Sequence, residues 1–155
     1  MPVFDLHAEL AAIADVLTSR GIEHCVCGAL ALAVHGKPRA TKDIDVVVAP
    51  ASIDGAKTAL RAIGYDVAAA PMTFRSGVTV HRISRVESKE LMMLDLIVAD
   101  GPLAGVLDSR IQVDWGSRRL WVVSRDGLVA MKRLAGRPQD LADLEALGEE
   151  DPGDA

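Results

Sequence analysis

Three aspartates in this chain stand where an acidic side chain is costly unless it binds something. Asp43 and Asp45 form a D-x-D pair at the start of the apolar run IDVVVA, and Asp95 interrupts the apolar run LMMLDLIV. Side chains alternate between the two faces of a strand, so Asp43 and Asp45 share one face while Ile44 points to the other. Because neighbouring carboxylates repel each other and buried acids lose hydration, we expect these side chains to be solvated, ion-paired or bound to a cation.

Binding of a cation would explain the positions of all three acids. If the strand of Asp95 lies beside that of Asp45, three carboxylates converge on one patch of sheet. Such hard oxygen ligands suit Mg²⁺ or Mn²⁺ rather than zinc, and magnesium held by few carboxylates takes substrate phosphates as further ligands. Two such ions would serve in-line phosphoryl transfer, with Asp95 as general base or second ligand for the attacking group. For Asp43 and Asp45 alone, loop capping or pairing with Arg39 or Lys42 is the simpler explanation.

The rest of the pattern indicates the helices and strands that must position these acids. Apolar residues three and four apart predict amphipathic helices, short apolar runs predict strands, and glycine or proline marks most boundaries. Helices are predicted at residues 5–19, 28–36, 52–64, 125–135 and 138–147, and strands at 23–27, 44–49, 65–69, 73–74, 78–83, 91–98, 111–113 and 120–123, the last two as edge strands. This mixture predicts an α/β or α+β domain with a mixed sheet.

A glycine turn lies upstream of the acids. The turn CGALA follows a predicted strand and opens a predicted helix. Gly28 permits close approach of a backbone or ligand, and free N–H groups at a helix start attract anions; a tight turn packed on the sheet is the simpler alternative. Together with His35-Gly36, the loop PRATKDID at 38–45 and the segment LVAMKRLAGRPQDLADLEAL at 128–147, this turn resembles the signature of the DNA polymerase β-type nucleotidyltransferase superfamily. The match is nearest to small bacterial AbiEii-like proteins and covers roughly residues 22–147.

The resemblance implies the nucleotidyltransferase fold, a mixed central sheet flanked by helices, and transfer of a nucleoside monophosphate from an NTP to an acceptor hydroxyl. It implies two Mg²⁺ or Mn²⁺ ions as cofactors. The residues it assigns to the site are Asp43, Asp45 and Asp95 for metal binding and catalysis, Gly28 and Ala29 for the β- and γ-phosphates, Lys132 near the triphosphate, and Arg39 and Thr41 flanking the site.

The resemblance leaves the acceptor open among a protein side chain, the 3′ end of a tRNA and a small molecule such as an aminoglycoside. Similar proteins often act as toxins paired with an antitoxin. Larger relatives continue into a helical domain beyond the closing helices, so we expect a partner protein, a second copy or a very open cleft to complete acceptor recognition.

Other interpretations compete with these. A catalytically silent protein of the same fold that binds a nucleotide or a partner has no need of three costly acids, and a metal phosphohydrolase more usually has histidine ligands. Lys132 also fits an ordinary exposed helix position. Arg137, Asp140 and Asp143 are predicted to form a solvated helical face, with Asp140 and Asp143 one turn apart.

Composition limits the class of protein. The 155 residues suffice for one domain, expected at 1–148 with a disordered tail at 149–155. The net charge of -5 argues against a generally basic nucleic-acid-binding body. No apolar run is long enough for a signal peptide or a membrane span, which predicts a cytoplasmic protein with no membrane partner. Cys25 and Cys27 lack a second ligand pair for zinc and are predicted to pack as small apolar residues.

Overall fold

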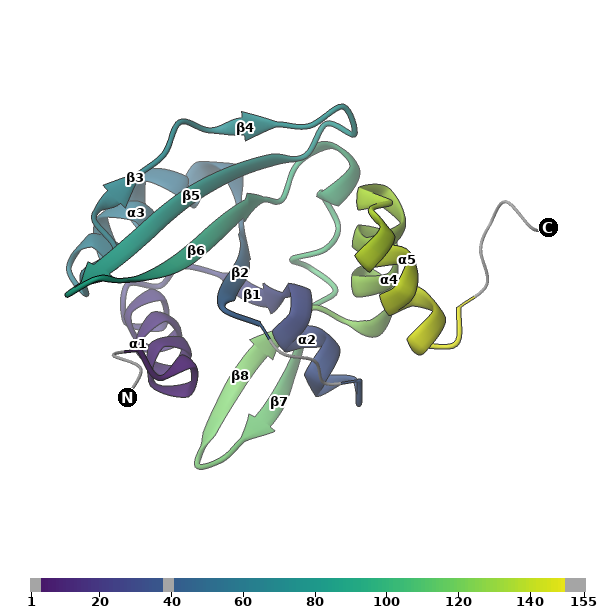
Figure 1. The fold of residues 1–155 in the computed structure, drawn as a ribbon, viewed down its shortest axis with the longest axis horizontal. Helices are drawn as coiled ribbons and strands as arrows, with labels where there is room; N and C mark the ends of the chain where they lie inside the picture. The colour runs from purple at the N-terminus through teal and green to yellow at the C-terminus, as the bar shows by residue number, and fades with distance from the viewer. Residues whose placement is uncertain (1–3, 38–40, 150–155) are drawn as a thin grey trace.

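The computed structural model describes residues 4–37 and 41–149, which form a mixed sheet with helices around it (Figure 1). The helices are α1 (Leu6–Ser19), α2 (Gly28–Val34), α3 (Ile53–Arg61), α4 (Arg125–Ala135) and α5 (Pro138–Ala146), with short 3-10 turns η1 (Pro50–Ser52) and η2 (Gly101–Leu103). The strands are β1 (His24–Cys27), β2 (Asp43–Val48), β3 (Val67–Ala68), β4 (Met72–Thr73), β5 (Thr79–Glu87), β6 (Glu90–Val98), β7 (Ile111–Trp115) and β8 (Arg118–Val122). The predicted α/β class with a mixed sheet is confirmed.

The strand order is β3-β5-β6-β2-β1-β8-β7, with β4 pairing with β5 from outside this path. β2 runs parallel to β6 and β1 runs parallel to β8, while the other paired strands are antiparallel. The prediction of an edge strand at 120–123 was wrong, because β8 lies between β1 and β7. Val122 pairs with Val26 and is fully buried, which is typical of a strand inside a sheet.

β5 and β6 form a hairpin longer than the sequence pattern predicted. β5 continues from the predicted end at Ile83 to Glu87, and the turn that follows contains Ser88 with a positive φ of 56°. Ser84, Arg85 and Glu87 interrupt the apolar pattern in this extension, so the sequence pattern did not reveal it. The pairing of β5 with β6 nevertheless extends from Val80 to Glu87.

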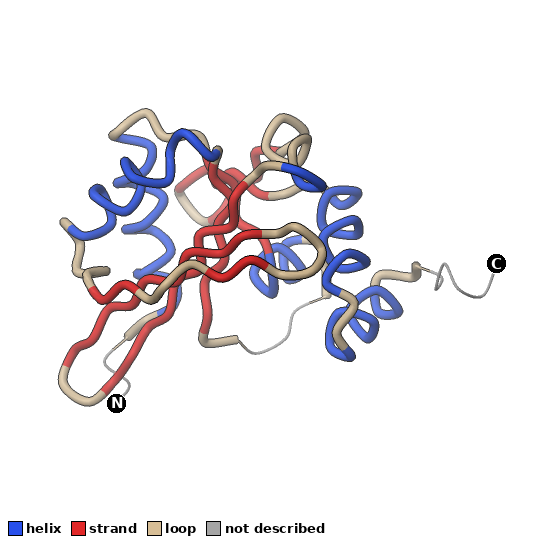
Figure 2. The backbone as a smooth tube through the Cα atoms, turned by 90° about the horizontal axis from the view of Figure 1, so that it is seen from above, coloured by secondary structure: helices blue, strands red, loops and turns tan. Residues whose placement is uncertain are grey.

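The two faces of the sheet differ beside β5 and β6. α1 and α3 lie together on one face (Figures 1 and 2), and they cover the buried positions Ile44, Leu94 and Leu96. Strand alternation turns Asp45 and Asp95 to the opposite face, where no described helix lies over β5 and β6. The main core therefore anchors β2 and β6 from behind and leaves their acids accessible.

None of the helices among the described residues is long and apolar enough to cross a membrane. The predicted tail lies outside the described residues, apart from Glu149.

Candidate active site

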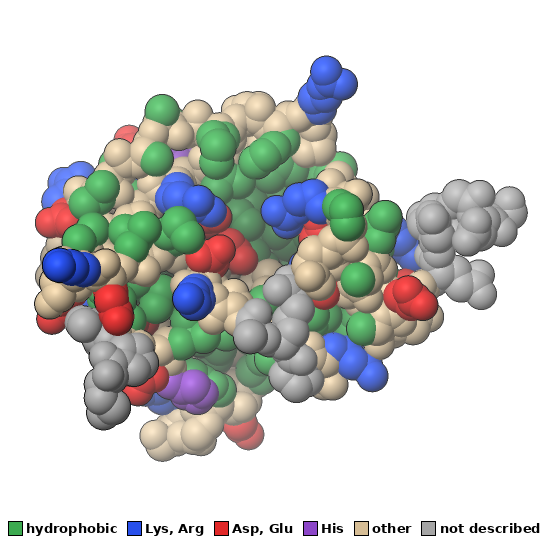
Figure 3. Space-filling model, viewed as in Figure 1, with side chains coloured by type: hydrophobic (Ala, Val, Ile, Leu, Met, Phe, Trp, Pro, Cys, Tyr) green, Lys and Arg blue, Asp and Glu red, His purple; other side chains and the backbone are tan. Residues whose placement is uncertain are grey.

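Asp45 and Asp95 are direct neighbours in the sheet. They are Cα partners in the parallel pair of β2 and β6, and Asp43 precedes Asp45 on the same face. Each of the three side chains is half-buried. The expected convergence of these carboxylates is confirmed, and we call them the sheet acids. Figure 3 shows acidic side chains at the middle of this face, with basic side chains on both sides of them.

Asp45 is electrostatically strained in the folded protein. Burial, followed by the charges of Asp95 and then Asp43, raises its pKa from 3.8 to about 6, although Lys132 and Arg137 oppose the shift. A carboxylate with a raised pKa is one that the folded protein does not neutralise well. A bound cation would relieve this strain.

Gly28 makes room for the carboxylate of Asp45. Its φ of +66° is strained for any L residue, and a Cβ built on it would overlap Oδ2 of Asp45 and lie 3.0 Å from the Asp45 Cγ. The pairing of Cys27 with Asp45 across β1 and β2 brings this turn alongside the acid. The close approach expected at Gly28 is therefore made by the side chain of Asp45.

The loop residues predicted to flank the site are only partly described. The Asp43 N–H donates to Oγ1 of Thr41 over 3.2 Å, and the Thr41 hydroxyl lies 3.3 Å from the Asp43 carbonyl oxygen. Thr41 therefore fixes the start of β2. Arg39 lies outside the described residues. Ala29 is buried in the first turn of α2.

Arg82 is a site residue that the sequence pattern did not reveal. It is the cross-strand partner of Asp95 between β5 and β6. Its Nε donates to Oδ1 of Asp95 over 2.8 Å, and its Nη2 donates to Oδ2 over 3.0 Å. This two-pronged ion pair is the strongest geometry available to an arginine and a carboxylate. Among residues 4–37 and 41–149, Asp95 is the sheet acid that forms an ion pair with another side chain.

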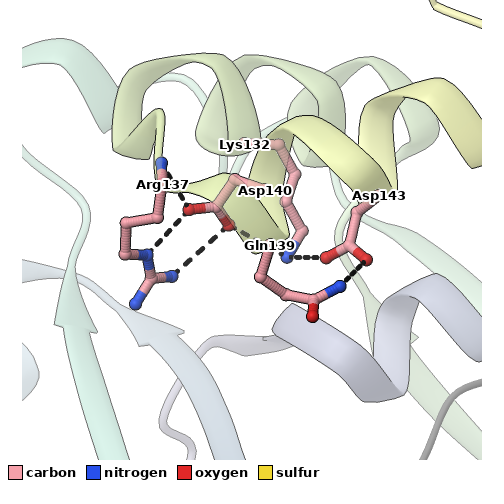
Figure 4. Close-up of polar contacts among 5 residues, drawn as sticks. All are labelled: Lys132, Arg137, Gln139, Asp140 and Asp143. Atoms are coloured by element: carbon pink, nitrogen blue, oxygen red, sulfur yellow. Dashed lines mark hydrogen bonds and ion pairs between the residues drawn. The ribbon is translucent and has the colours of Figure 1, made fainter.

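Lys132 is buried at the interface of α4 and α5, and only 6% of the residue is exposed. Its Nζ lies 2.9 Å from Oδ2 of Asp143 and 3.3 Å from Oδ1 of Asp140 (Figure 4). Arg137 Nε donates to Asp140 over 2.7 Å, and Gln139 Nε2 donates to Asp143 over 2.9 Å. We call these five residues the α4–α5 cluster.

Arg137 is exposed, as the prediction of a solvated helical face requires, but that prediction was wrong for Asp140 and Asp143. Asp140 is 1% exposed and Asp143 is 3% exposed, because both turn toward the ammonium group of Lys132. Burial raises the pKa of Asp140, but the hydrogen bond from Arg137 and the charge of Lys132 outweigh it and leave this pKa below its ordinary value. The alternative of an exposed Lys132 was also wrong, because α5 packs over it.

The sheet acids fit a hard divalent cation by their chemistry, since carboxylate oxygens are the ligands that Mg²⁺ and Mn²⁺ prefer. Among residues 4–37 and 41–149, no group of three or more His, Cys, Asp or Glu side chains is placed to hold a metal ion together. Arg82 donates one hydrogen bond to each oxygen of Asp95, which leaves this carboxylate fewer free lone pairs for a cation. Magnesium is commonly held by one or two carboxylates together with water and substrate phosphates.

Comparison with solved structures identifies the architecture. A protein described as a nucleotidyltransferase, TM1012 of Thermotoga maritima, superimposes with a TM-score of 0.68 over 90% of each chain at 14% identity. The chain has the nucleotidyltransferase fold. The lincosamide antibiotic adenylyltransferase LnuA, solved with lincomycin bound, has a TM-score of 0.63 at 17% identity and covers 91% of this chain and 95% of its own.

A third structure, a protein of Helicobacter pylori also described as a nucleotidyltransferase, has a TM-score of 0.56 at 18% identity over 91% of this chain and 66% of its own. No family model matches the sequence, and no curated protein matches it. At these identities the nucleotidyltransferase fold is what the structures share with this chain. The activity must be argued from the site.

Proposed function

We propose that this chain is a metal-dependent nucleotidyltransferase that transfers a nucleoside monophosphate from an NTP to an acceptor hydroxyl. The observation that carries the proposal is the placement of Asp45 beside Asp95, on the face of β2 and β6 that points away from α1 and α3 (Figure 1). Desolvated, mutually repelling acids destabilise a fold, and a cation that arrives with a nucleotide gives them a purpose. The activities named for TM1012 and LnuA support the same reaction class.

In this proposal Asp43 and Asp45 would hold Mg²⁺ or Mn²⁺, and the ion would neutralise charge on the NTP phosphates. Asp95 accepts a hydrogen bond from the acceptor hydroxyl and takes its proton. The acceptor oxygen forms a bond to the α-phosphorus as the bond from that phosphorus to the β-phosphate oxygen breaks, and pyrophosphate leaves. The expectation of two ions belongs to the same proposal, with the second ion completed by the substrate.

The other expected residues have more limited roles here. Gly28 admits the Asp45 carboxylate, and the backbone of Gly28 and Ala29 lies next to it as the candidate phosphate contact. Lys132 is committed to Asp140 and Asp143, so it acts on the site through its charge, which lowers the pKa of Asp45. Thr41 fixes the start of the acid-bearing strand.

For the acceptor, we propose a small hydroxylated molecule as the first class to test, because LnuA is named as an antibiotic adenylyltransferase. A protein side chain and a tRNA 3′ end are the other acceptor classes, and either of these would fit a toxin with an antitoxin partner. A second copy of the chain is the alternative means of completing the cleft.

The test is a labelling assay with four α-labelled NTPs, Mg²⁺ or Mn²⁺, and three acceptor pools: lincomycin with aminoglycosides, total RNA, and total protein. We expect label transfer to one pool and loss of transfer in Asp45→Asn. Asp114→Asn is the matched control, because its side chain is 90% exposed on the edge strand β7. Tight NTP binding by calorimetry with no transfer to any pool would identify a silent binding protein instead.

A further inference from the structure

Three adjacent strands present a row of charged side chains at the proposed site. Arg82 on β5 is the cross-strand partner of Asp95 on β6, and Asp95 is the partner of Asp45 on β2. Paired residues in neighbouring strands point to the same face of a sheet. Asp95 therefore stands between a cation on one side and a carboxylate on the other.

The two neighbours act on Asp95 in opposite ways. Asp45 repels it, and without a counter-charge the Asp95 carboxylate would turn away from Asp45. Arg82 prevents this by binding Oδ1 and Oδ2 at once, over 2.8 Å and 3.0 Å. Two parallel hydrogen bonds fix the plane of the carboxylate as well as its position.

The pair is held by rigid surroundings. β5 and β6 are each nine residues long and pair along nearly their whole length. The Asp95 side chain is 15% exposed and that of Arg82 is 35% exposed, so the pair is partly shielded from water. Each carboxylate oxygen still has a second lone pair, which leaves Asp95 able to accept a hydrogen bond from a hydroxyl.

We propose that Arg82 is a positioning residue of the transfer reaction, which holds the Asp95 carboxylate in the orientation that receives the acceptor hydroxyl. This inference rests on the proposed function and divides the site into two parts. Asp43 and Asp45 face the cation and the nucleotide, whereas Asp95 with Arg82 faces the acceptor. Arg82 is thus required for the rate of transfer and not for nucleotide binding.

The test compares Arg82→Lys and Arg82→Gln with the wild type, using α-labelled ATP, Mn²⁺ and the acceptor pool that the wild type labels. Lysine keeps the charge but loses the two-pronged geometry. We expect kcat to fall about tenfold to a hundredfold, with Arg82→Gln the slower variant, while the KM for ATP is unchanged. Calorimetry with Mn²⁺ and a non-hydrolysable ATP analogue should give the wild-type affinity for both variants.

Arg85→Lys is the matched control. Arg85 lies on the same strand and pairs with Glu9 and Glu87 away from the sheet acids. The Arg85→Lys variant should keep the wild-type kcat. Thermal unfolding should show that all variants fold.

Three results would overturn the inference. Wild-type kcat in Arg82→Lys and Arg82→Gln would show that Arg82 has no part in the reaction. Loss of binding to the ATP analogue would make Arg82 a phosphate ligand. A wild-type protein that labels no pool overturns the proposed function itself, and the positioning role falls with it.

Discussion

The α4–α5 cluster and the sheet acids are two groups of charged side chains that differ in how far the protein's own cations neutralise their carboxylates. In the first, two cations, Lys132 and Arg137, meet two buried carboxylates, Asp140 and Asp143, so the opposite charges are equal in number. In the second, the described residues provide one ion-paired cation, Arg82, for three carboxylates. Among the described residues, the first group is therefore balanced, whereas the second has more carboxylates than paired cations.

This difference separates structure from function. A buried ion-pair network with satisfied partners holds elements together, and here it joins α4 to α5. Acids without sufficient counter-charge lower stability, and such sites are typical of ligand binding. The two groups are also coupled, because Lys132 and Arg137 partly oppose the rise in the pKa of Asp45.

The largest expected effect is on the balanced cluster. Lys132→Met leaves two buried carboxylates without their ammonium partner, so the free energy of unfolding should fall by about 3–5 kcal/mol. Denaturant unfolding measures this loss. Adding Asp140→Asn and Asp143→Asn to Lys132→Met should recover most of it, and a single variant as stable as the wild type would contradict the structural role of the cluster.

Gly28→Ala should cost about 2–4 kcal/mol, because backbone strain at φ +66° adds to overlap with the Asp45 carboxylate. Gly116→Ala is the control, since its φ is +61° and nothing lies within 4 Å of the added Cβ. Thermal or urea unfolding compares the two. Equal losses would mean that Asp45 does not lie against the turn.

Asp45→Asn should stabilise the metal-free protein by about 1–3 kcal/mol near pH 8, because it removes a charge that the fold disfavours. The folded pKa of about 6 exceeds the unfolded value of 3.8, so the stability contributed by protonation of Asp45 is lost as pH rises between these values. With a chelator present, the free energy of unfolding of the wild type should fall as pH rises through this range, and that of Asp45→Asn should not. If Asp45→Asn were less stable than the wild type at every pH, the claim that the charge of Asp45 destabilises the folded protein would be refuted.

The smallest effect is expected at the rim of the balanced cluster. Arg137→Gln should change the free energy of unfolding by less than about 1 kcal/mol, because its side chain is 74% exposed and Asp140 keeps Lys132 and the backbone N–H of residue 137 as partners. Chemical denaturation of this variant beside Lys132→Met measures how far burial, rather than the number of ion pairs, sets stability. Equal losses in the two variants would contradict that distinction.

Much of the fold could be predicted because its local patterns agree with its tertiary structure. Period-two alternation in β2 placed Asp43 and Asp45 on one face, and Gly28 marked a turn that permits close approach. The order of the strands and the register between β2 and β6 are long-range properties. The sequence could therefore predict that the acids converge only if β2 and β6 are neighbours, and the structure shows that they are.

The missed residues had weaker signals. Arg82 lies within a predicted strand, but only the register of β5 against β6 shows that it faces Asp95. Lys132 continues the buried stripe of Leu128 and Val129 at helical spacing, which was a sign that it is buried. Its partners are on the next helix, so their burial depends on how α4 and α5 pack.

The most direct test of this account is a Mn²⁺ titration of the wild type and Asp45→Asn, followed by thermal unfolding. If the sheet acids are kept to take a cation, the melting temperature of the wild type rises with Mn²⁺. Asp45→Asn should then have a higher melting temperature than the wild type without metal, and Mn²⁺ should raise it little. Equal gains in both proteins, or no gain in the wild type, would contradict the claim that these acids form a cation site.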